Sequence, residues 1–570
     1  MTETAASRAS IYWVLGTAVA ILAAAPPGVF DSTLTSRLAI YPLCGAALLW
    51  AGREAAGRMQ CLAGLMAALL PALWTLFAPI PIQALPQAVR WASFGMMIAG
   101  LSGLARADGA RGLFNGICIA GGLAAISVIF LGPDGTAGNP NRLGPLLAVS
   151  AVACASRRTG ISAWARLPLG ALSAAGLFLS GFYTGWIGLL LGLGWLLTGD
   201  RWGIRPILPV TVLVVGQLVL GLSPGLAGRI HPSAQLRTLI WRQGVDLSLE
   251  RFPTGAGTGQ ARLHLYSTGP ERLRQLAGED RRIDHLHSDL LTLPVEQGAV
   301  GLVALLLLIL WISRARGGDG RGAMLLAVWP MLATDLPLAT PLGALPVAAV
   351  IACVPPRRGS VRLPGWLPSA LAVAALAWTA SVLTGYVQLH RGRAAAMRGR
   401  HGEAAEHLDR ATDLIPFEER AFLYLAASRL EQGATLAAAD AAASFNRIYP
   451  SYWRGHELEG TVLLSLGRPQ AAGGAFLQAL KLSPRDSTRT RFALALGALY
   501  SVPENLQDRQ FLAKEILRNF DMPHSIGPEG LRSAASALRE LADSLESSSE
   551  IAPLLRGHAL RFESAADRSI

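Results

Sequence analysis

Charged residues are scarce in this chain of 570 residues. Asp, Glu, Lys and Arg make up 15% of it, whereas a soluble domain typically carries about 25%. Hydrophobic residues make up 52%, and the mean hydropathy is +0.39. This composition argues against an ordinary soluble domain and indicates a membrane protein with many spans.

Lysine is nearly absent, occurring only at Lys481 and Lys514. The net charge of +12 therefore comes from arginine. The arginines lie in short runs between apolar segments rather than in one basic patch, which is typical of cytoplasmic loops and not of nucleic-acid binding. No nucleic-acid partner is expected.

Cysteine is also rare, and the five residues lie in or beside apolar stretches: Cys44, Cys61, Cys118, Cys154 and Cys353. Without a CxxC spacing they predict neither a disulfide framework nor a zinc site. No cleavable signal peptide is evident, because residues 1–10 lead directly into an apolar stretch that predicts a first span.

The apolar stretches predict a polytopic bundle, since about 17–25 mainly apolar residues cross a bilayer as a helix. Thirteen candidates lie at 11–30, 36–51, 61–80, 86–104, 112–132, 142–156, 164–180, 184–198, 206–224, 295–313, 322–336, 338–354 and 365–388. Several are short, and the 322–354 pair is compatible with a re-entrant hairpin, so the count is about 12 or 13.

The charges between these stretches predict sidedness. Every loop that follows an even-numbered span is basic: Arg53 and Arg58; Arg106 and Arg111; Arg157, Arg158 and Arg166; Arg201 and Arg205; Arg314, Arg316 and Arg321; Arg357, Arg358 and Arg362. The short loops that follow odd-numbered spans carry almost no positive charge. The positive-inside rule then places the N-terminus in the cytoplasm, and residues 225–294 and everything after 388 on the outer face.

A repeat begins after residue 390, where the composition becomes Ala-rich and helical. The segments "RATDLIP", "FNRIYP" and "LKLSP" end at Pro416, Pro450 and Pro484, and Gly433 and Gly467 recur at the same interval of 34 residues. A 34-residue period with helix-turn-helix patterning looks like tetratricopeptide repeats, in which each unit packs on the next. Such an array often binds a protein partner, and packing or dimerisation is the alternative.

The polar insertion at 225–294 is long enough to form a site. Residues 233–250 predict an amphipathic helix that begins at Pro232 or Ser233 and is stopped by Pro253. Arg237 and Trp241, four residues apart, share one face of it. "PTGAGTG" follows, and its glycines, Gly255 and Gly257 among them, permit close approach of the backbone, although such a loop alone is weak evidence for phosphate binding.

The segment "RRIDHLHSDLL" then leads into span ten. His285 and His287 have the HxH spacing of some metal ligands, but no further His or Cys nearby completes a site, so no metal is expected. The simplest alternative is a solvated loop in which His287 only caps a helix.

The order "RTLIW", "FPTGAGTG" and "HSDLLTLPVEQGAVG" resembles the O-antigen ligase and polymerase superfamily. Two more segments fit, "GNPNRLG" (138–144), which contains Asn139 and Asn141, and "TDLPLATPLGALP" (334–346). The resemblance covers roughly residues 130–350. A fused tetratricopeptide domain also occurs in such proteins, notably in bacterial protein O-oligosaccharyltransferases.

The resemblance implies a metal-independent enzyme without cofactors in a bacterial inner membrane. It transfers a glycan from an undecaprenyl-diphosphate carrier to an acceptor hydroxyl on the periplasmic face. The family's catalytic histidine falls on His287, and its loop arginine, which engages the diphosphate, falls on Arg237, with Arg242 as a further candidate. Supporting positions are Trp241, Gly255, Gly257, Ser288, Asp289, Glu296, Asn139 and Asn141.

The chain departs from the family pattern at three places. Ser288 replaces the usual Asn after the histidine, and Pro294 interrupts a helix that is normally continuous. A second arginine, common between spans seven and eight, is missing: Tyr183 or Thr184 stands there. The candidates to replace it are Arg142, Arg229 and Arg242.

These residue types suit the implied chemistry. Arginine matches the geometry of phosphate, and a neutral imidazole can take the acceptor's proton as the hydroxyl attacks the anomeric carbon, which inverts that centre. Asp289 either orients the imidazole or stabilises the helix N-terminus. Glu296 is expected to be mainly structural. The acceptor is lipid A core, a growing glycan or a protein, and the rival classes are a transporter and a non-catalytic scaffold of polysaccharide export.

The predicted fold is therefore all-α. Its parts are spans one to nine (1–224), the periplasmic loop with the site (225–294), spans ten to thirteen (295–389), the periplasmic repeats (390–547) and a C-terminal tail that can fray (548–570).

Overall fold

The protein is described here from a computed structural model. It describes residues 36–107, 109–132, 140–156, 159, 161–202, 232–267, 273, 285–313, 320–353, 359–483, 494–499, 503–518, 528–545 and 550–568. The chain divides into two compact units, one of Met1–Arg262 with Asp284–His390 and one of Leu263–Ile283 with Arg391–Ile570. The division at His390 lies one residue beyond the boundary expected at 389, where the composition changes.

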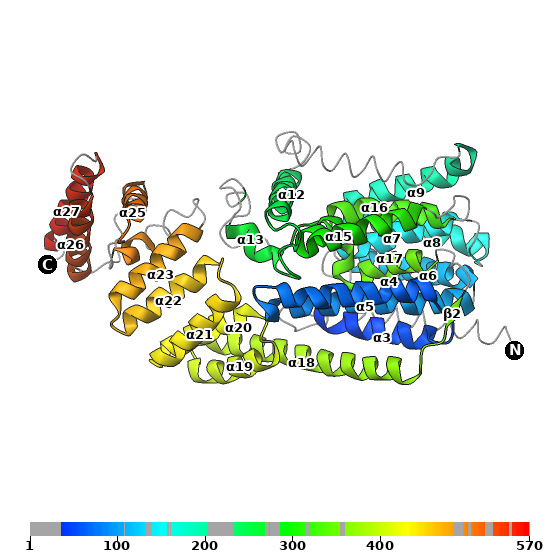
Figure 1. The fold of residues 1–570 in the computed structure, drawn as a ribbon, viewed down its shortest axis with the longest axis horizontal. Coiled ribbons are helices and arrows are strands. Elements are labelled where there is room, and N and C mark those ends of the chain that lie inside the picture. Colours follow the sequence, from blue (N-terminus) through cyan, green and yellow to red (C-terminus); the bar gives the residue numbers. More distant parts are fainter. Residues whose placement is uncertain are drawn as a thin grey trace. The chain divides into compact units, whose positions relative to one another are not determined.

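The first unit is built almost entirely of helices (Figure 1). Its elements are η1 (Ser36–Ile40), α3 (Tyr41–Gly52), β1 (Ala56–Gly57), α4 (Arg58–Trp74), η2 (Thr75–Phe77), α5 (Pro81–Ala107), α6 (Gly109–Leu131), α7 (Pro140–Ala155), α8 (Ala163–Ser180), α9 (Tyr183–Trp202), α12 (Pro232–Glu250), α15 (Asp289–Ser313), α16 (Arg321–Thr334), η4 (Pro337–Ala339), α17 (Pro341–Ala352) and β2 (Ser360–Val361). Two further helices, α13 (Ala261–Ser267) and α18 (Trp366–Met397), begin in this unit and end in the second.

Eleven of the predicted spans fall on these helices, while those at 11–30 and 206–224 lie outside the described residues. Five described helices are long and apolar enough to cross a membrane: Arg58–Phe77, Pro81–Arg106, Arg111–Leu131, Asp289–Leu307 and Trp366–Met397. Their length and composition support the all-α bundle. Passage through a membrane stays a prediction.

Small residues let the N-terminal helices approach closely. A Cβ on Gly64 of α4 would lie 2.5 Å from the carbonyl oxygen of Gly95 on α5, and one on Gly95 would lie 2.2 Å from that of Gly64. Between α3 and α5, a Cβ on Gly52 would lie 1.9 Å from the Gly100 carbonyl oxygen, and one on Gly100 would lie 2.3 Å from the Leu48 carbonyl oxygen. Backbone contact through small residues is how helices commonly pack in membranes, where burial of apolar side chains gives little drive.

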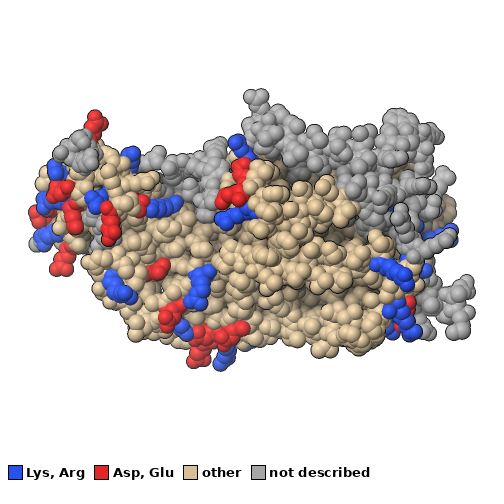
Figure 2. All heavy atoms as spheres, in the orientation of Figure 1, with Lys and Arg blue, Asp and Glu red and all other residues tan. Residues whose placement is uncertain are grey.

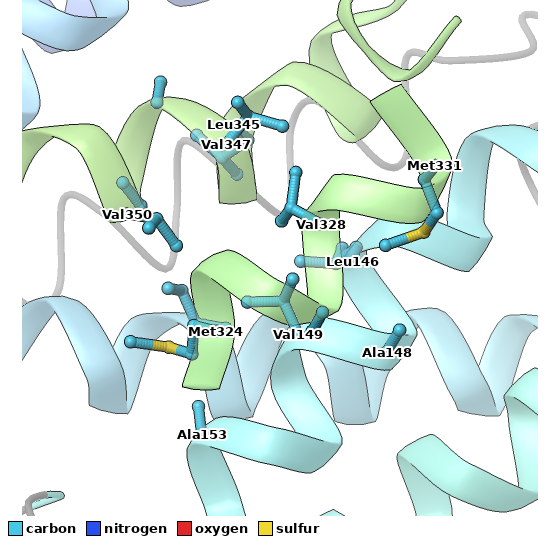
Figure 3. Close-up of a cluster of buried hydrophobic side chains, with 14 of the residues drawn as sticks. Leu146, Ala148, Val149, Ala153, Met324, Val328, Met331, Leu345, Val347 and Val350 are labelled. Atoms are coloured by element: carbon cyan, nitrogen blue, oxygen red, sulfur yellow. The ribbon is translucent and has the colours of Figure 1, made fainter. Parts of the chain in front are cut away.

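The centre of the unit is formed by α7, α16 and α17 (Figure 3). Leu146, Val149, Met324, Val328 and Val347 interdigitate there and are almost fully buried. Every residue of α17 is buried, which is typical of a helix at the core of a large bundle. At 14 and 12 residues, α16 and α17 are roughly 21 and 18 Å long, short of the ~30 Å hydrocarbon layer. These lengths favour the re-entrant alternative for 322–354.

A two-residue antiparallel pairing ties distant parts of this unit together. Ala56 and Gly57 of β1 pair with Val361 and Ser360 of β2. The Leu363 amide donates to the Arg53 carbonyl at 2.9 Å, and Arg362 forms an ion pair with Glu54 at 2.8 Å. The residues before α4 and before α18 are thereby joined.

The second unit repeats a helix pair. Its elements are α19 (His401–Leu414), α20 (Glu419–Glu431), α21 (Thr435–Ile448), α22 (Trp453–Ser465), α23 (Pro469–Leu482), α25 (Leu506–Arg518), α26 (Pro528–Ser544) and α27 (Ile551–Arg568). The helices α19, α21 and α23 begin 34 residues apart, as do α20 and α22. Each buries one face, with Ala405, Leu408 and Phe445 among the buried residues. This arrangement confirms the tetratricopeptide-like repeat.

The C-terminus differs from expectation. The residues predicted as a tail from 548 form α27, which packs on α26 with Leu555, Ala559 and Phe562 buried. Ion pairs Arg532–Asp567 and Arg556–Asp543 join the two helices. The error arose because the tail lies beyond the 34-residue period, although its apolar spacing is that of an amphipathic helix.

Candidate functional site

The helix α12 carries Arg237 and Trp241 on one face and holds both against neighbouring elements. Arg237 Nη1 donates to the Thr334 carbonyl at 2.9 Å, and its Nη2 lies 3.7 Å from Asp335 Oδ2, at the end of α16. Trp241, 7% exposed, donates from Nε1 to the His287 carbonyl at 3.4 Å. Arg237 and His287, fifty positions apart in the chain, are thereby joined to one site through α12.

His287 lies just before α15 with a backbone conformation rarely adopted by residues other than glycine. Its φ is +49°, the one positive φ at a non-glycine residue among those described, and its side chain is half-buried. Ser288 is the residue before the first turn of α15, in the N-cap position. Its Oγ accepts from the Leu291 amide at 3.2 Å, and its carbonyl accepts from Thr292 Oγ1 at 2.8 Å. Backbone strain of this kind, roughly 1–3 kcal/mol, is concentrated at functional sites. The Ser288 side chain thus caps α15, and a function of His287 beyond the helix start stays a prediction.

Asp289 is 1% exposed and ties α15 to the turn between α16 and α17. Its Oδ2 accepts from the Leu338 amide at 2.7 Å, and its own amide donates to the Asp335 carbonyl at 3.1 Å. Arg90 of α5 approaches the other carboxylate oxygen, Oδ1, at 4.0 Å. Asp289 thus ties α15 to η4, a function that was not predicted, while orientation of the imidazole or stabilisation of the helix N-terminus by Asp289 stays a prediction.

The glycine-rich loop is a structural connection. Gly255 and Gly257 have φ of +78° and +93°. The Ala256 and Gly257 amides donate to the Val295 and Glu296 carbonyls, each at 2.9 Å, and the Ala299 amide donates to the Pro253 carbonyl at 2.8 Å. Because these amides are already bound to α15, the loop does not offer them to a phosphate, and its weak phosphate-binding alternative is not supported.

The loop fills a break in α15. Gly298 has φ +58° and ψ −135°, so the helix is interrupted there. Pro294, which the sequence suggested as the interruption, lies within the first helical part. A Cβ on Gly298 would lie 2.0 Å from the Pro253 carbonyl oxygen. Glu296, 5% exposed, accepts a hydrogen bond from the Gly259 amide, which agrees with the mainly structural part expected for it.

The other predicted site residues lie on α7, α9 and α12 or outside the described residues. Arg242 is exposed on α12, and Asn141 is half-buried in the first turn of α7. Of the replacements considered for the missing second arginine, Arg142 is 5% exposed on α7, while Arg229, like Asn139, lies outside the described residues. Tyr183 begins α9 and is exposed. In the described part of the chain no three His, Cys, Asp or Glu side chains lie close enough to hold a metal ion.

Two residues of this cluster were not assigned to the site from the sequence. Arg90 pairs with Asp289, and Asp335 pairs with Arg237. Both had a recognisable signal, a charge within an apolar predicted span, which in membrane helices usually marks a functional position. The sequence could not show that the two charges meet the loop, because that depends on how α5 and α16 pack against α15.

The comparisons with known proteins leave this site without a relative. No protein-family model and no curated protein sequence matches the chain. Among solved structures, it is similar to the MamA protein (14% identity, 33% of this chain and 91% of that one, TM-score 0.23), to yeast Tom70 (12%, 88% and 96%, 0.21) and to the Cut9–Hcn1 hetero-tetramer of the APC/C (12%, 82% and 76%, 0.19). At these TM-scores the matches carry no inference about function.

Proposed function

We propose that the chain is a metal-independent, inverting glycosyltransferase of the O-antigen ligase type in the bacterial inner membrane. It transfers a glycan from an undecaprenyl-diphosphate carrier to an acceptor hydroxyl on the periplasmic face. The N-terminus lies in the cytoplasm, and the 225–294 loop and the repeats lie in the periplasm.

The surface of the first unit supports a bilayer environment. On α4 a stripe of large apolar side chains is 44–52% exposed: Met59, Leu62, Leu65, Met66, Leu69 and Leu73. Figure 2 shows charged side chains of the first unit near β2, whereas the described surface over the middle of α5 is free of them on this face. An apolar patch of this extent marks contact with a membrane or a partner.

The observation that carries the proposal is that one helix, α12, carries Arg237 and also contacts the backbone of His287 through Trp241. The tie runs from Trp241 to the His287 carbonyl, and from Arg237 through Asp335 to Asp289. The residue that carries a permanent cation and the residue that carries an imidazole are thereby linked by one short chain of contacts. A half-buried histidine whose backbone is held in this way is suited to act as a base, because the segment that carries it is positioned before substrate arrives.

The chemistry follows from these two groups. Arg237 offers planar donors to the diphosphate, on which negative charge develops as the sugar–phosphate bond breaks. His287 accepts the proton of the acceptor hydroxyl as its oxygen attacks the anomeric carbon, a contribution of roughly 10²–10⁴ in rate. A single displacement inverts the anomeric centre, and the protonated imidazole later releases its proton to water.

The repeat unit is relevant to which acceptor receives the glycan. Stacked helix pairs form extended surfaces that commonly bind proteins or long ligands. This favours a protein or a long glycan over lipid A core as acceptor, and makes a repeat-unit polymerase or a protein O-oligosaccharyltransferase the main alternatives. The same unit also supports a rival of another class, a non-catalytic scaffold or transporter component that recruits export proteins.

The test is complementation of a deletion strain with wild type, His287→Ala, His287→Asn and, as a matched control, His285→Ala. Lipopolysaccharide, secreted polysaccharide and envelope glycoproteins are blotted side by side at equal membrane abundance. We expect wild type and His285→Ala to restore one glycan product, which identifies the acceptor, and both His287 variants to reduce it by about 10²–10⁴-fold.

Two results would argue against the proposal. Full complementation by His287→Asn would show that His287 is not a catalytic base, and the scaffold or transporter would then be the remaining explanation. Equal loss in His285→Ala and His287→Ala would indicate a shared structural or ligand-binding function of the two histidines.

A further inference from the structure

Arg90 is a buried arginine whose burial is not explained by its pairing with Asp289 alone. It lies nine residues into α5, roughly 13 Å along the helix from Pro81, and is 7% exposed. Removing a guanidinium from water is costly, and within apolar helices such a charge is rarely kept without a ligand or a function.

Its donors are incompletely used. Arg90 Nη2 lies 4.0 Å from Asp289 Oδ1, too far for a hydrogen bond, and its Nε and Nη2 are buried without a hydrogen-bond partner. Tyr41, fully buried and within electrostatic range of both residues, likewise has a hydroxyl without a partner. Buried polar atoms are almost always satisfied, so the two donors of Arg90 without a partner, with a third within electrostatic range at Tyr41, point to a ligand that supplies acceptors.

Asp289 does not supply the hydrogen-bond acceptors that Arg90 lacks. Its Oδ2 is held by the Leu338 amide at 2.7 Å, and its backbone amide is held by Asp335, so the carboxylate is fixed toward η4 rather than closed on Arg90. It therefore lowers the electrostatic cost of the buried cation without satisfying its hydrogen-bonding capacity. A guanidinium in this state is matched to an oxyanion with several acceptor oxygens.

An apolar cavity adjoins Asp289. Trp91, Phe94, Leu290 and Leu293 line it, and Asp289 is its charged member. Arg90 directly precedes Trp91 in the chain and pairs with Asp289, so a phosphate bound at Arg90 would lie near these apolar walls. That combination suits an amphiphile whose charged group is attached to a hydrocarbon chain, rather than a free soluble anion.

We propose that Arg90, with the buried Tyr41 hydroxyl as a further donor, binds a phosphate group of the lipid-linked donor. This inference rests on the proposed function and deepens it: Arg90 and Arg237 pair with Asp289 and Asp335, the two aspartates that are joined through the Asp289 amide. Each arginine takes part of the diphosphate. Because Arg90 is 7% exposed, binding includes a local parting of α5 and α15, favoured by the acceptors that the ligand brings.

The experiment measures binding to the purified full chain in nanodiscs. The probes are undecaprenyl diphosphate, undecaprenol and inorganic pyrophosphate. The variants are Arg90→Gln, Arg90→Lys and the control Arg106→Gln, which changes an arginine in the last turn of the same helix. We expect Arg90→Gln to bind undecaprenyl diphosphate roughly 10- to 100-fold more weakly than wild type, with undecaprenol binding and Arg106→Gln unchanged. Arg90→Lys is intermediate, because it keeps the charge and loses the planar fork.

A double variant, Arg90→Gln with Asp289→Asn, separates ligand binding from charge balance. If Arg90 binds phosphate, the double variant stays as weak as the single one. If Arg90 only neutralises Asp289, the double variant returns to within about threefold of wild type, and the inference is overturned. Binding of diphosphate by Arg90→Gln as tightly as by Arg106→Gln overturns it too.

The probes also distinguish the inference from the proposed function. Arg90-dependent binding of undecaprenyl diphosphate together with full glycan transfer by His287→Ala would leave the phosphate site in place and remove the catalytic proposal. Arg90-dependent binding of pyrophosphate without any preference for the lipid form would overturn the lipid-linked ligand.

Discussion

Replacing Gly298 by alanine tests the contact between the glycine-rich loop and α15 without reference to any reaction. The added Cβ would lie 2.0 Å from the Pro253 carbonyl oxygen and 2.6 Å from the Gly255 amide nitrogen, at a φ of +58°. The backbone strain is worth about 1–3 kcal/mol and the overpacking a similar amount, so the closed loop should lose about 2–6 kcal/mol.

The lower end of that range is already measurable. A loss of about 2 kcal/mol raises the fraction of open loop roughly 30-fold. Trypsin cleavage after Arg262, which follows the loop, then accelerates by about the same factor when opening is fast relative to cleavage. The assay is limited proteolysis of the detergent-solubilised full chain, with the cut located by mass spectrometry.

The control is Gly194→Ala on α9, where a Cβ would meet nothing within 4 Å. Alanine there should leave cleavage unchanged, since it is the better helix former. If Gly298→Ala is cut after Arg262 no faster than Gly194→Ala, the loop does not close the break in α15 as described.

Three further predictions concern the repeats and the sidedness. Phe562→Ala should lower the stability of the α26–α27 pair by about 3–5 kcal/mol, because the ring is fully buried; a thermal melt of the full chain with unchanged unfolding of the repeats would contradict it. His456, whose Nδ1 lies 3.7 Å from Glu459 Oε2, lowers the pKa of Glu459, as does Asn446, which donates to the same oxygen at 2.7 Å. The carboxylate therefore contributes stability above its unfolded pKa, and this is lost as the pH falls through the lower folded value. Glu459→Gln should therefore weaken the pH dependence of the melting temperature in the acid range, and an unchanged slope would refute the pairing. Reporter fusions after residues 108, 270 and 450 should report cytoplasm, periplasm and periplasm, and any other order would reverse the assigned sidedness.

Local signals in the sequence were enough to predict individual helices and the repeat. The helix at 232–250 was predicted within one residue at its start, because its apolar period and the following Pro253 act within a few residues. The repeat was predicted because its 34-residue interval is visible without knowledge of packing. Arg237 and Trp241 were placed on one face for the same reason.

Contacts between distant segments were not predictable in this way. The break in α15 was assigned to Pro294, since proline is the usual signal, yet it occurs at Gly298, where the loop from Pro253 donates and accepts backbone hydrogen bonds. A glycine shows that an unusual φ is possible, not that a neighbour will require it. Arg90 and Asp335 are charges within apolar predicted spans, but their partners depend on the packing of α5 and α16 against α15.

The pairing of β1 with β2 sets a condition on biosynthesis. Gly57 and Ser360 are separated by about 300 residues, which a ribosome adds in roughly 15–60 s at 5–20 residues per second. During that interval β1 has been made and its partner has not. Assembly of the first unit therefore cannot finish co-translationally in order of synthesis: the helices next to β1 must wait for the segment that precedes α18. A ribosome that stalls between α9 and α17 would leave β1 without its partner strand, and the first unit would stay incomplete.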